Sequence, residues 1–287
     1  MSIKNQIENL CRNCISLEIT GNTLSKVGET RFGGKPDVPN DFEWPYFEGK
    51  DFKGVVKKRP LSFLAQFNCK ELSVHDIDHL LPDYGLLSFF YETDTQPWGF
   101  DPKDKGCARV FWFKDTSNLH AEEFPVDMEQ DFKFPSIKIQ TSHQFSYPSL
   151  IDLYGIFPEE KEETLISALN ELTGKDPYEK MNGSQLLGWA DVIQDSMYEE
   201  CDLVSQGYYI GDGIAYNKIP KDILQQSKDT SIERWSLLFQ LDTVEHEGFE
   251  LMFGDSGHIY FYIKKEDLSQ RNFDQIWLIL QLSLIHI

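Results

Sequence analysis

Short apolar runs bounded by glycine and proline recur along the chain and predict β-strands. The clearest are residues 61–67, 85–91 and 108–113, which are rich in the aromatic and branched side chains that favour strands. Near the end, residues 248–253 and 258–263 flank a glycine-rich segment at 254–257. This arrangement predicts a β-hairpin with a four-residue turn.

Three segments show helical spacing instead. The first has apolar residues at steps of four, three and four: Ile3, Ile7, Leu10 and Cys14. Residues 71–81 predict a second helix, which Pro82 ends. The third begins at Pro158, carries glutamates in its first turn and stops at Gly174, as expected from the helix dipole and from glycine C-caps.

Three pairs of blocks recur in the same order in the two halves of the chain. Residues 31–41 align with 185–195 and share a glycine, a valine and two aspartates. Residues 61–68 align in the same way with 235–242, and residues 85–91 align with 257–263. The shared order favours an internal duplication, with repeats at about 31–115 and 185–268 that pack as two halves of one body.

The same blocks resemble the YwqG-like family of bacterial proteins. The segments that carry the resemblance are 31–36, 63–67, 81–91, 186–194, 253–257 and 273–277. The resemblance spans roughly residues 25–280 and implies an α+β fold of unknown function, so it carries over no catalytic residues.

We therefore expect an α+β fold, with mostly antiparallel sheet built from two internally repeated halves and peripheral helices. Residues 1–24 are expected to form an N-terminal helix and turn before a domain at 25–281. Residues 282–287 do not resemble a family ending and are assigned as an atypical tail.

Charge narrows the choice of partner. The chain has 47 acidic and 27 basic residues, a net charge of −20. This charge repels nucleic acids and anionic membranes, so neither is expected as a partner, whereas a basic protein would suit it. The sequence does not indicate an oligomeric state.

Cysteine content and hydropathy bear on the compartment. Five cysteines, an odd number, argue against a disulfide framework and for the cytoplasm. The N-terminus lacks the apolar stretch of a signal peptide, and the apolar run at 276–287 is too short to cross a bilayer. We therefore expect a cytoplasmic protein.

Three motifs are candidates for catalysis or metal binding, and each fits a structural interpretation better. Residues 254–257 have the order of a serine-protease nucleophile loop, but Gly, Asp and Ser are also ordinary turn formers. His75 and His79 are spaced for one face of a helix, yet no further metal-binding motif surrounds them. Cys11 and Cys14 have redox-pair spacing, but no strand precedes them. No metal or cofactor is expected.

Two sets of residues are candidates for binding a partner. The first contains Trp44 and Trp98, with Asp101 close behind, because loop aromatics give a large contact area at a low entropy cost. The second set is polar: Gln66, Gln194, Gln240, Asp191 and Asp255. Gln66 and Gln240 recur at the same point of two apolar strands, where each amide either binds loop backbone or points into a shared cleft.

Together these features favour a binding or interaction protein over an enzyme, with an acidic surface and loop aromatics as contact points. The alternative is an enzyme of unrecognised class that uses carboxylates near the repeat interface, such as Asp191, Asp195 and Asp255. Two of these carboxylates facing each other in a deep pocket would favour the enzyme. A shallow groove lined by Trp44 and Trp98 would favour the binding protein.

Overall fold

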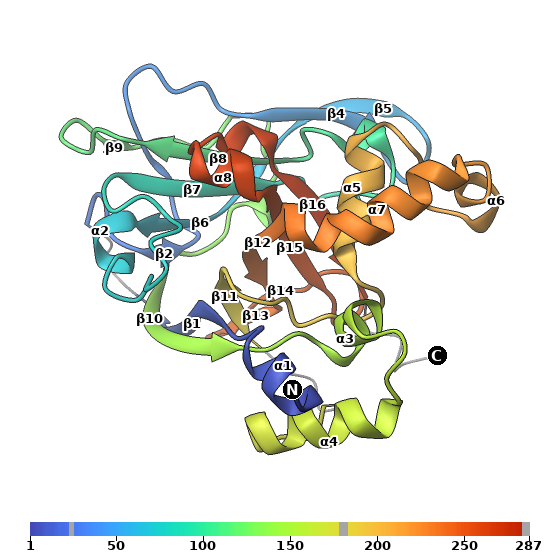
Figure 1. Ribbon diagram of the computed structural model, residues 1–287. Coiled ribbons are helices and arrows are strands. Elements are labelled where there is room, and N and C mark those ends of the chain that lie inside the picture. Colours follow the sequence, from blue (N-terminus) through green and yellow to red (C-terminus); the bar gives the residue numbers. More distant parts are fainter. Residues whose placement is uncertain (23–25, 178–182, 283–287) are drawn as a thin grey trace.

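The computed structural model describes residues 1–22, 26–177 and 183–282 and is built on a ten-stranded antiparallel sheet (Figure 1). Two long strands, β1 (Arg12–Asn22) and β10 (Ile137–Ser146), pair at its centre. One wing continues from β10 through β2 (Arg31–Phe32), β6 (Ser62–Asn68), β7 (Leu86–Tyr91) and β8 (Ala108–Phe113). The other continues from β1 through β11 (Ser184–Leu186), β12 (Trp235–Leu241), β15 (His258–Lys264) and β16 (Trp277–Gln281).

The sheet curls until its two wings pack against each other. Phe67 and Phe89 of the first wing contact Phe239 of the second, with ring centroids 5.4 and 4.8 Å apart. Phe89 also meets Phe261 at 5.3 Å. Burying one such side chain contributes about 1.5–3 kcal/mol. The continuous apolar runs in these strands therefore fill a single core between the wings.

The two wings share strand order and several details of register. A β-bulge interrupts β6–β7 at Leu64, and another interrupts β12–β15 at Leu238. The bulged carbonyl accepts a hydrogen bond in each case, from Gly33 N (2.8 Å) in one wing and from Leu187 N (3.2 Å) in the other. These equivalent bonds lie in the blocks that align along the sequence.

Helices cover the outside of the sheet. Three pack together below the central strands in Figure 1: α1 (Ile3–Glu8), α3 (Leu150–Ile156) and α4 (Glu162–Thr173). Two lie against the second wing: α5 (Met197–Ser205) and α7 (Lys221–Arg234). Short helices complete the set: α2 (Cys69–Leu72), α6 (Gly213–Tyr216) and α8 (Lys265–Ser269), with 3-10 turns η1 (Pro102–Asp104), η2 (Gln130–Phe132) and η3 (Phe273–Gln275).

Three two-stranded ribbons flank the main sheet. They are β3 (Asp37–Val38) with β9 (His120–Ala121), β4 (Tyr46–Lys50) with β5 (Val56–Pro60), and β13 (Val244–His246) with β14 (Phe249–Leu251). The mixed fold with a large antiparallel sheet and peripheral helices confirms the expected class. In the described part of the chain, no helix has the length and hydrophobicity needed to cross a membrane.

Two helix predictions were too long. The first helix stops at Glu8, Cys11 directly precedes the central strand β1 and Cys14 lies within it, because the polar–apolar alternation of a strand begins there. The segment 1–22 is therefore helix and central strand rather than helix and turn. The second helix is only the single turn Cys69–Leu72, followed by turns.

The predicted hairpin at 248–263 is wrong in its pairing. Strand β15 pairs with β12 and β16, and β14 pairs with β13, so only the bridge between Phe253 and Gly257 joins the two sides. The third helix begins at Glu162, four residues after Pro158, and its C-cap Gly174 is confirmed in the left-handed region at φ +69°. The proposed tail lies largely outside the described residues, which end at Leu282.

Candidate binding site

The loop that carries Trp98 is fastened along the outer edge of β16, in the opposite wing. Leu280 N donates to the Trp98 carbonyl at 3.0 Å, and Trp277 Nε1 donates to the Gly99 carbonyl at 2.9 Å. Gly99 has φ +80°, and a Cβ there would lie 1.8 Å from the Leu278 carbonyl oxygen. Only glycine permits this approach, so the backbone beneath Trp98 is tightly constrained.

The Trp98 side chain is 44% exposed although its backbone is held. Its ring meets Phe100 edge-on at 6.1 Å, and the Phe100 carbonyl accepts a hydrogen bond from Ile210 N at 3.1 Å. Tyr209, next to Ile210, is 42% exposed. We call Trp98 and Phe100 the Trp98 platform. It is an aromatic surface on one loop, and the backbone of this loop is bonded to the distant residue Ile210.

Carboxylates accompany the platform. Asp101 caps the turn η1 and accepts from Lys103 N at 2.9 Å. Asp104 Oδ2 accepts from Gly99 N at 3.0 Å, and burial raises the pKa of this carboxyl to about 6. Asp255 is exposed in the turn at 254–257, and Gln96 Oε1 ties this turn to the Trp98 loop by accepting from Gly254 N at 2.8 Å.

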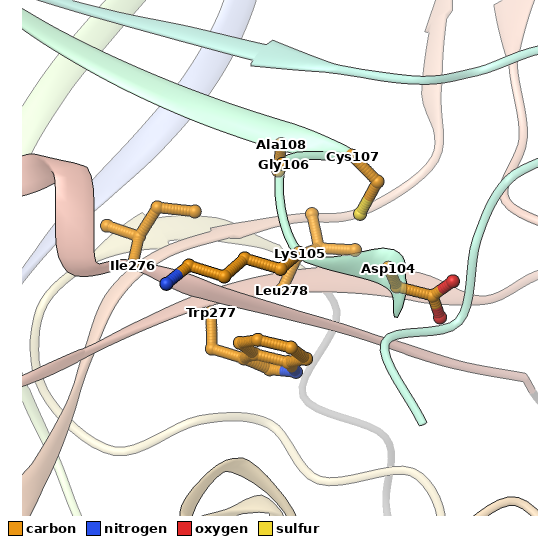
Figure 2. A pocket seen from close by; sticks show the side chains of 8 residues that line it. All are labelled: Asp104, Lys105, Gly106, Cys107, Ala108, Ile276, Trp277 and Leu278. Atoms are coloured by element: carbon orange, nitrogen blue, oxygen red, sulfur yellow. The ribbon is translucent and has the colours of Figure 1, made fainter. Parts of the chain in front are cut away.

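A small cavity lies beneath the loop between the starts of β8 and β16, lined in part by Asp104, Lys105 and Trp277 (Figure 2). The Asp104 and Lys105 side chains extend in opposite directions. The cavity volume is about 10 Å³, no more than one water molecule needs. This volume is too small for a substrate. The raised pKa of Asp104 therefore reflects only the burial of its carboxyl group beneath the loop.

A wider hollow lies over the β13–β14 ribbon and opens to solvent. Its lining is acidic and partly aromatic: Glu245, His246, Glu247, Gly248, Phe249 and Glu250. Metal-binding groups of three or more His, Cys, Asp or Glu side chains do not occur among the described residues. The hollow adds to the acidic surface without forming a deep pocket.

The recurring glutamines hold loop backbone. Gln66 Oε1 accepts from Asp37 N at 3.0 Å, and its Nε2 donates to Glu29 O at 2.9 Å. Gln240 does the same in the other wing, with Asp191 N at 2.8 Å and Gly183 O at 2.8 Å. Both amides therefore bind loop backbone through the oxygen and through one N–H, and Gln66 Nε2 donates in addition to Asp37 Oδ2 at 2.6 Å.

A third glutamine, Gln281, was missed by sequence reasoning. Its Oε1 accepts from the amides of Ile193 and Gln194, each at 3.0 Å, and its Nε2 donates to Asp195 O at 2.7 Å. The signal was present, because Gln281 also ends an apolar strand. Gln194 thus binds Gln281 through its backbone amide. We call Gln66, Gln240 and Gln281, each of which holds loop backbone in this way, the glutamine clamps.

A buried ion pair in the first wing was also missed. Arg31 is 1% exposed and its Nη1 lies 2.7 Å from Asp37 Oδ2, which also accepts from Gln66 Nε2 at 2.6 Å. The aligned position in the other wing is Gln185, whose Nε2 donates to the carbonyls of Leu187 and Trp189. At this position the first wing therefore has a buried ion pair, and the second wing has a neutral amide.

Trp44 lies apart from the Trp98 platform. It packs half-buried against Phe42, Phe90 and Phe124, and its Nε1 donates to Leu61 O at 2.9 Å. The structure therefore places Trp98, Asp101 and the Asp255 turn in adjoining loops. It places Gln66 and Trp44 in the first wing, and Gln194, Gln240 and Asp191 around the clamps of the second.

The three motifs considered above for catalysis or metal binding lie in surroundings that explain them structurally. His258 is fully buried, stacks on Tyr260 and has Nε2 3.4 Å from Asp242 Oδ1, so a substrate cannot reach its ring. His75 and His79 follow α2 in a turn, not on a helix, and His79 has φ +52°. Burial raises the pKa of the Cys14 thiol to about 11, which keeps it protonated and unreactive.

Comparison with known proteins identifies a family without a known activity. Residues 30–281 match the family described as a domain of unknown function, DUF1963. A search of curated proteins gives no match. The matched region contains both wings, the Trp98 loop and all three glutamine clamps. The chain therefore belongs to the DUF1963 family.

Proposed function

We propose that this protein is a non-catalytic binding protein that takes a basic protein partner on the Trp98 platform. One observation carries the proposal: Trp98 is 44% exposed while hydrogen bonds from β16 hold its own carbonyl and that of Gly99. An aromatic side chain displayed on a constrained loop loses little entropy when a partner covers it. Such residues are the usual energetic centres of protein interfaces.

The negative charge of the chain supports a basic partner. The chain carries a net charge of −20, and Asp101 and the Asp255 turn adjoin the platform. Acidic side chains around an aromatic anchor favour basic partners and speed their association. The alternative, an enzyme using carboxylates near the repeat interface, receives less support, because neither the cavity beside Asp104 nor the hollow over β13–β14 is lined by Asp191, Asp195 or Asp255.

Three further features belong to the same proposal. Within its family we group the chain with the YwqG-like proteins, on the blocks from Arg31 to Trp277. We infer an internal duplication, supported by the matched bulges at Leu64 and Leu238 and the matched clamps of Gln66 and Gln240. We place the protein in the cytoplasm, which suits five cysteines without disulfide partners.

The test uses Trp98→Ala beside the wild-type chain, each immobilised and exposed to native lysate at low and then high salt. We expect the wild type to retain a basic protein that high salt releases, and Trp98→Ala to retain little of it. Tyr84→Ala is the matched control, because Tyr84 is 52% exposed elsewhere on the surface. Equal retention by both variants, or no retained protein at all, contradicts the proposal.

A further inference from the structure

The β4–β5 ribbon has the opposite charge to the rest of the chain. Between residues 48 and 59 lie five basic and two acidic side chains, a net charge of +3. The remainder of the chain therefore carries −23. The ribbon is a separate two-stranded sheet, drawn in light blue at the top of Figure 1. Arg59 is buried in ion pairs with Glu92 and Asp94, so the basic surface of the ribbon consists of four exposed lysines: Lys50, Lys53, Lys57 and Lys58.

The tip of the ribbon displays apolar side chains on an ordered turn. Phe52 is 83% exposed, and Val55 and Val56 are 53% and 57% exposed. Asp51 Oδ1 accepts from the amides of Lys53 and Val55, each at 2.9 Å, and Asp51 N donates to Val55 O at 2.8 Å. These bonds fix the turn, so the exposure of Phe52 is built into the backbone.

The ribbon also has open edges. Because Asp51 and Val55 form a hydrogen-bonded pair and such pairs alternate along an antiparallel ladder, Val56 and Lys58 direct their backbone groups outward from β5. Among the described residues, no further strand pairs with this ribbon. An extended peptide can bind to such an edge by adding a strand.

Lysines on an open edge often serve only to prevent pairing with other chains. Here Lys50 and Lys58 lie near the exposed Phe52 and Val56, while Lys57 pairs with Asp51 at 2.9 Å. A protective edge gains nothing from displayed apolar side chains. The combination instead matches a partner strand that is acidic and partly apolar.

We infer that the outer edge of β5 and the Phe52 tip bind an extended acidic peptide segment of a partner protein by strand addition. A short segment confines its negative charge to the ribbon. A nucleic acid or an anionic membrane extends beyond the ribbon and approaches the rest of the chain, which has a net charge of −23. This charge repels other anions over about 8 Å at physiological salt. The inference is independent of the Trp98 platform.

The experiment measures fluorescence polarisation of a labelled peptide of about eight residues in which Glu and Val alternate. We expect saturable binding that weakens between about 50 and 500 mM salt. A peptide N-methylated on the residues whose amides face β5 should not bind, whereas methylation of the alternate residues should be tolerated. This pair of probes tests strand addition without altering the protein.

Variants then locate the site. Lys58→Gln should weaken binding about three- to fivefold and Phe52→Ser about tenfold, with unchanged thermal melts because both side chains are exposed. Lys138→Gln, at an exposed lysine of β10, is the matched control and should bind as the wild type. Equal affinity in all variants, or no binding of the acidic peptide, overturns the inference. Phe52-dependent binding of phosphatidylserine vesicles or oligothymidine in its place overturns it as well.

Discussion

Glu200 lies in the first turn of α5 (Met197–Ser205). We expect its carboxyl to lower the free energy of unfolding of the protein as pH rises. Its Oε2 is enclosed with no hydrogen-bond partner among the described residues. Burial, and to a smaller extent the nearby Asp195 and Glu199 carboxylates, together raise the pKa of this carboxyl from 4.5 to about 8. The folded protein therefore retains a proton that the unfolded chain releases.

The sign and size of the effect follow from this difference in pKa. The pKa of Glu200 is higher in the folded protein than in the unfolded chain. The contribution of Glu200 to the free energy of unfolding is therefore at its full value below about pH 4.5 and falls progressively as pH rises to about 8. At 1.36 kcal/mol per pKa unit the full loss is about 5 kcal/mol. The side chain as a whole keeps partial exposure, so we expect about half of this, roughly 2 kcal/mol.

Glu200→Gln replaces the carboxyl by a neutral group of the same shape. We expect its free energy of unfolding to exceed that of the wild type by about 2 kcal/mol at about pH 8.5, and by much less at about pH 5.5. Urea titrations followed by tryptophan fluorescence measure both values. Glu163→Gln, at an exposed position of α4, is the control for the change in net charge. An equal effect at the two pH values, or destabilisation at the higher one, would refute the reasoning.

Three other substitutions test the supports of the fold, each by urea denaturation. Gly99→Ala should lower the free energy of unfolding by about 2 kcal/mol or more, since its Cβ collides with the Leu278 carbonyl, and a value near zero contradicts the clamp. Gln281→Leu should cost about 2–4 kcal/mol because three backbone groups lose their partner, whereas Gln140→Leu on the exposed face of β10 should cost little. Arg31→Met should cost about 3–5 kcal/mol because it strands the buried Asp37 carboxylate, and a neutral outcome would show that this charge is solvated.

The strands were the most predictable part of the structure. The runs at 61–67, 85–91, 108–113 and 258–263 were all located correctly. Three of them are largely apolar on both faces because both faces are covered, whereas β8 exposes Arg109. The partner of the last run could not be read locally. Strand β15 pairs with β12 and β16, and no short-range signal distinguishes this from a hairpin with β14.

The site residues show a similar division. Residue type identified Trp44 and Trp98 as loop aromatics, but only the fold separates the half-buried Trp44, bonded to Leu61 O, from the displayed Trp98. The glutamines had a clearer signal, because an amide inside an apolar strand requires partners. Sequence reasoning could not indicate that these partners are the backbone of a distant loop, such as Asp195 O for Gln281.

The bonds between the Trp98 loop and β16 also bear on solubility. Strand β16 is the run Trp277–Gln281, which is apolar, uncharged and ends the sheet, as in segments that seed cross-β aggregation. The Trp98 carbonyl occupies the amide of Leu280 and so blocks that edge. Loosening of this loop, by mutation or by a partner that pulls Trp98 away, therefore leaves an adhesive strand edge open while most of the fold is intact. Such damage would first be visible as fibrils or precipitate.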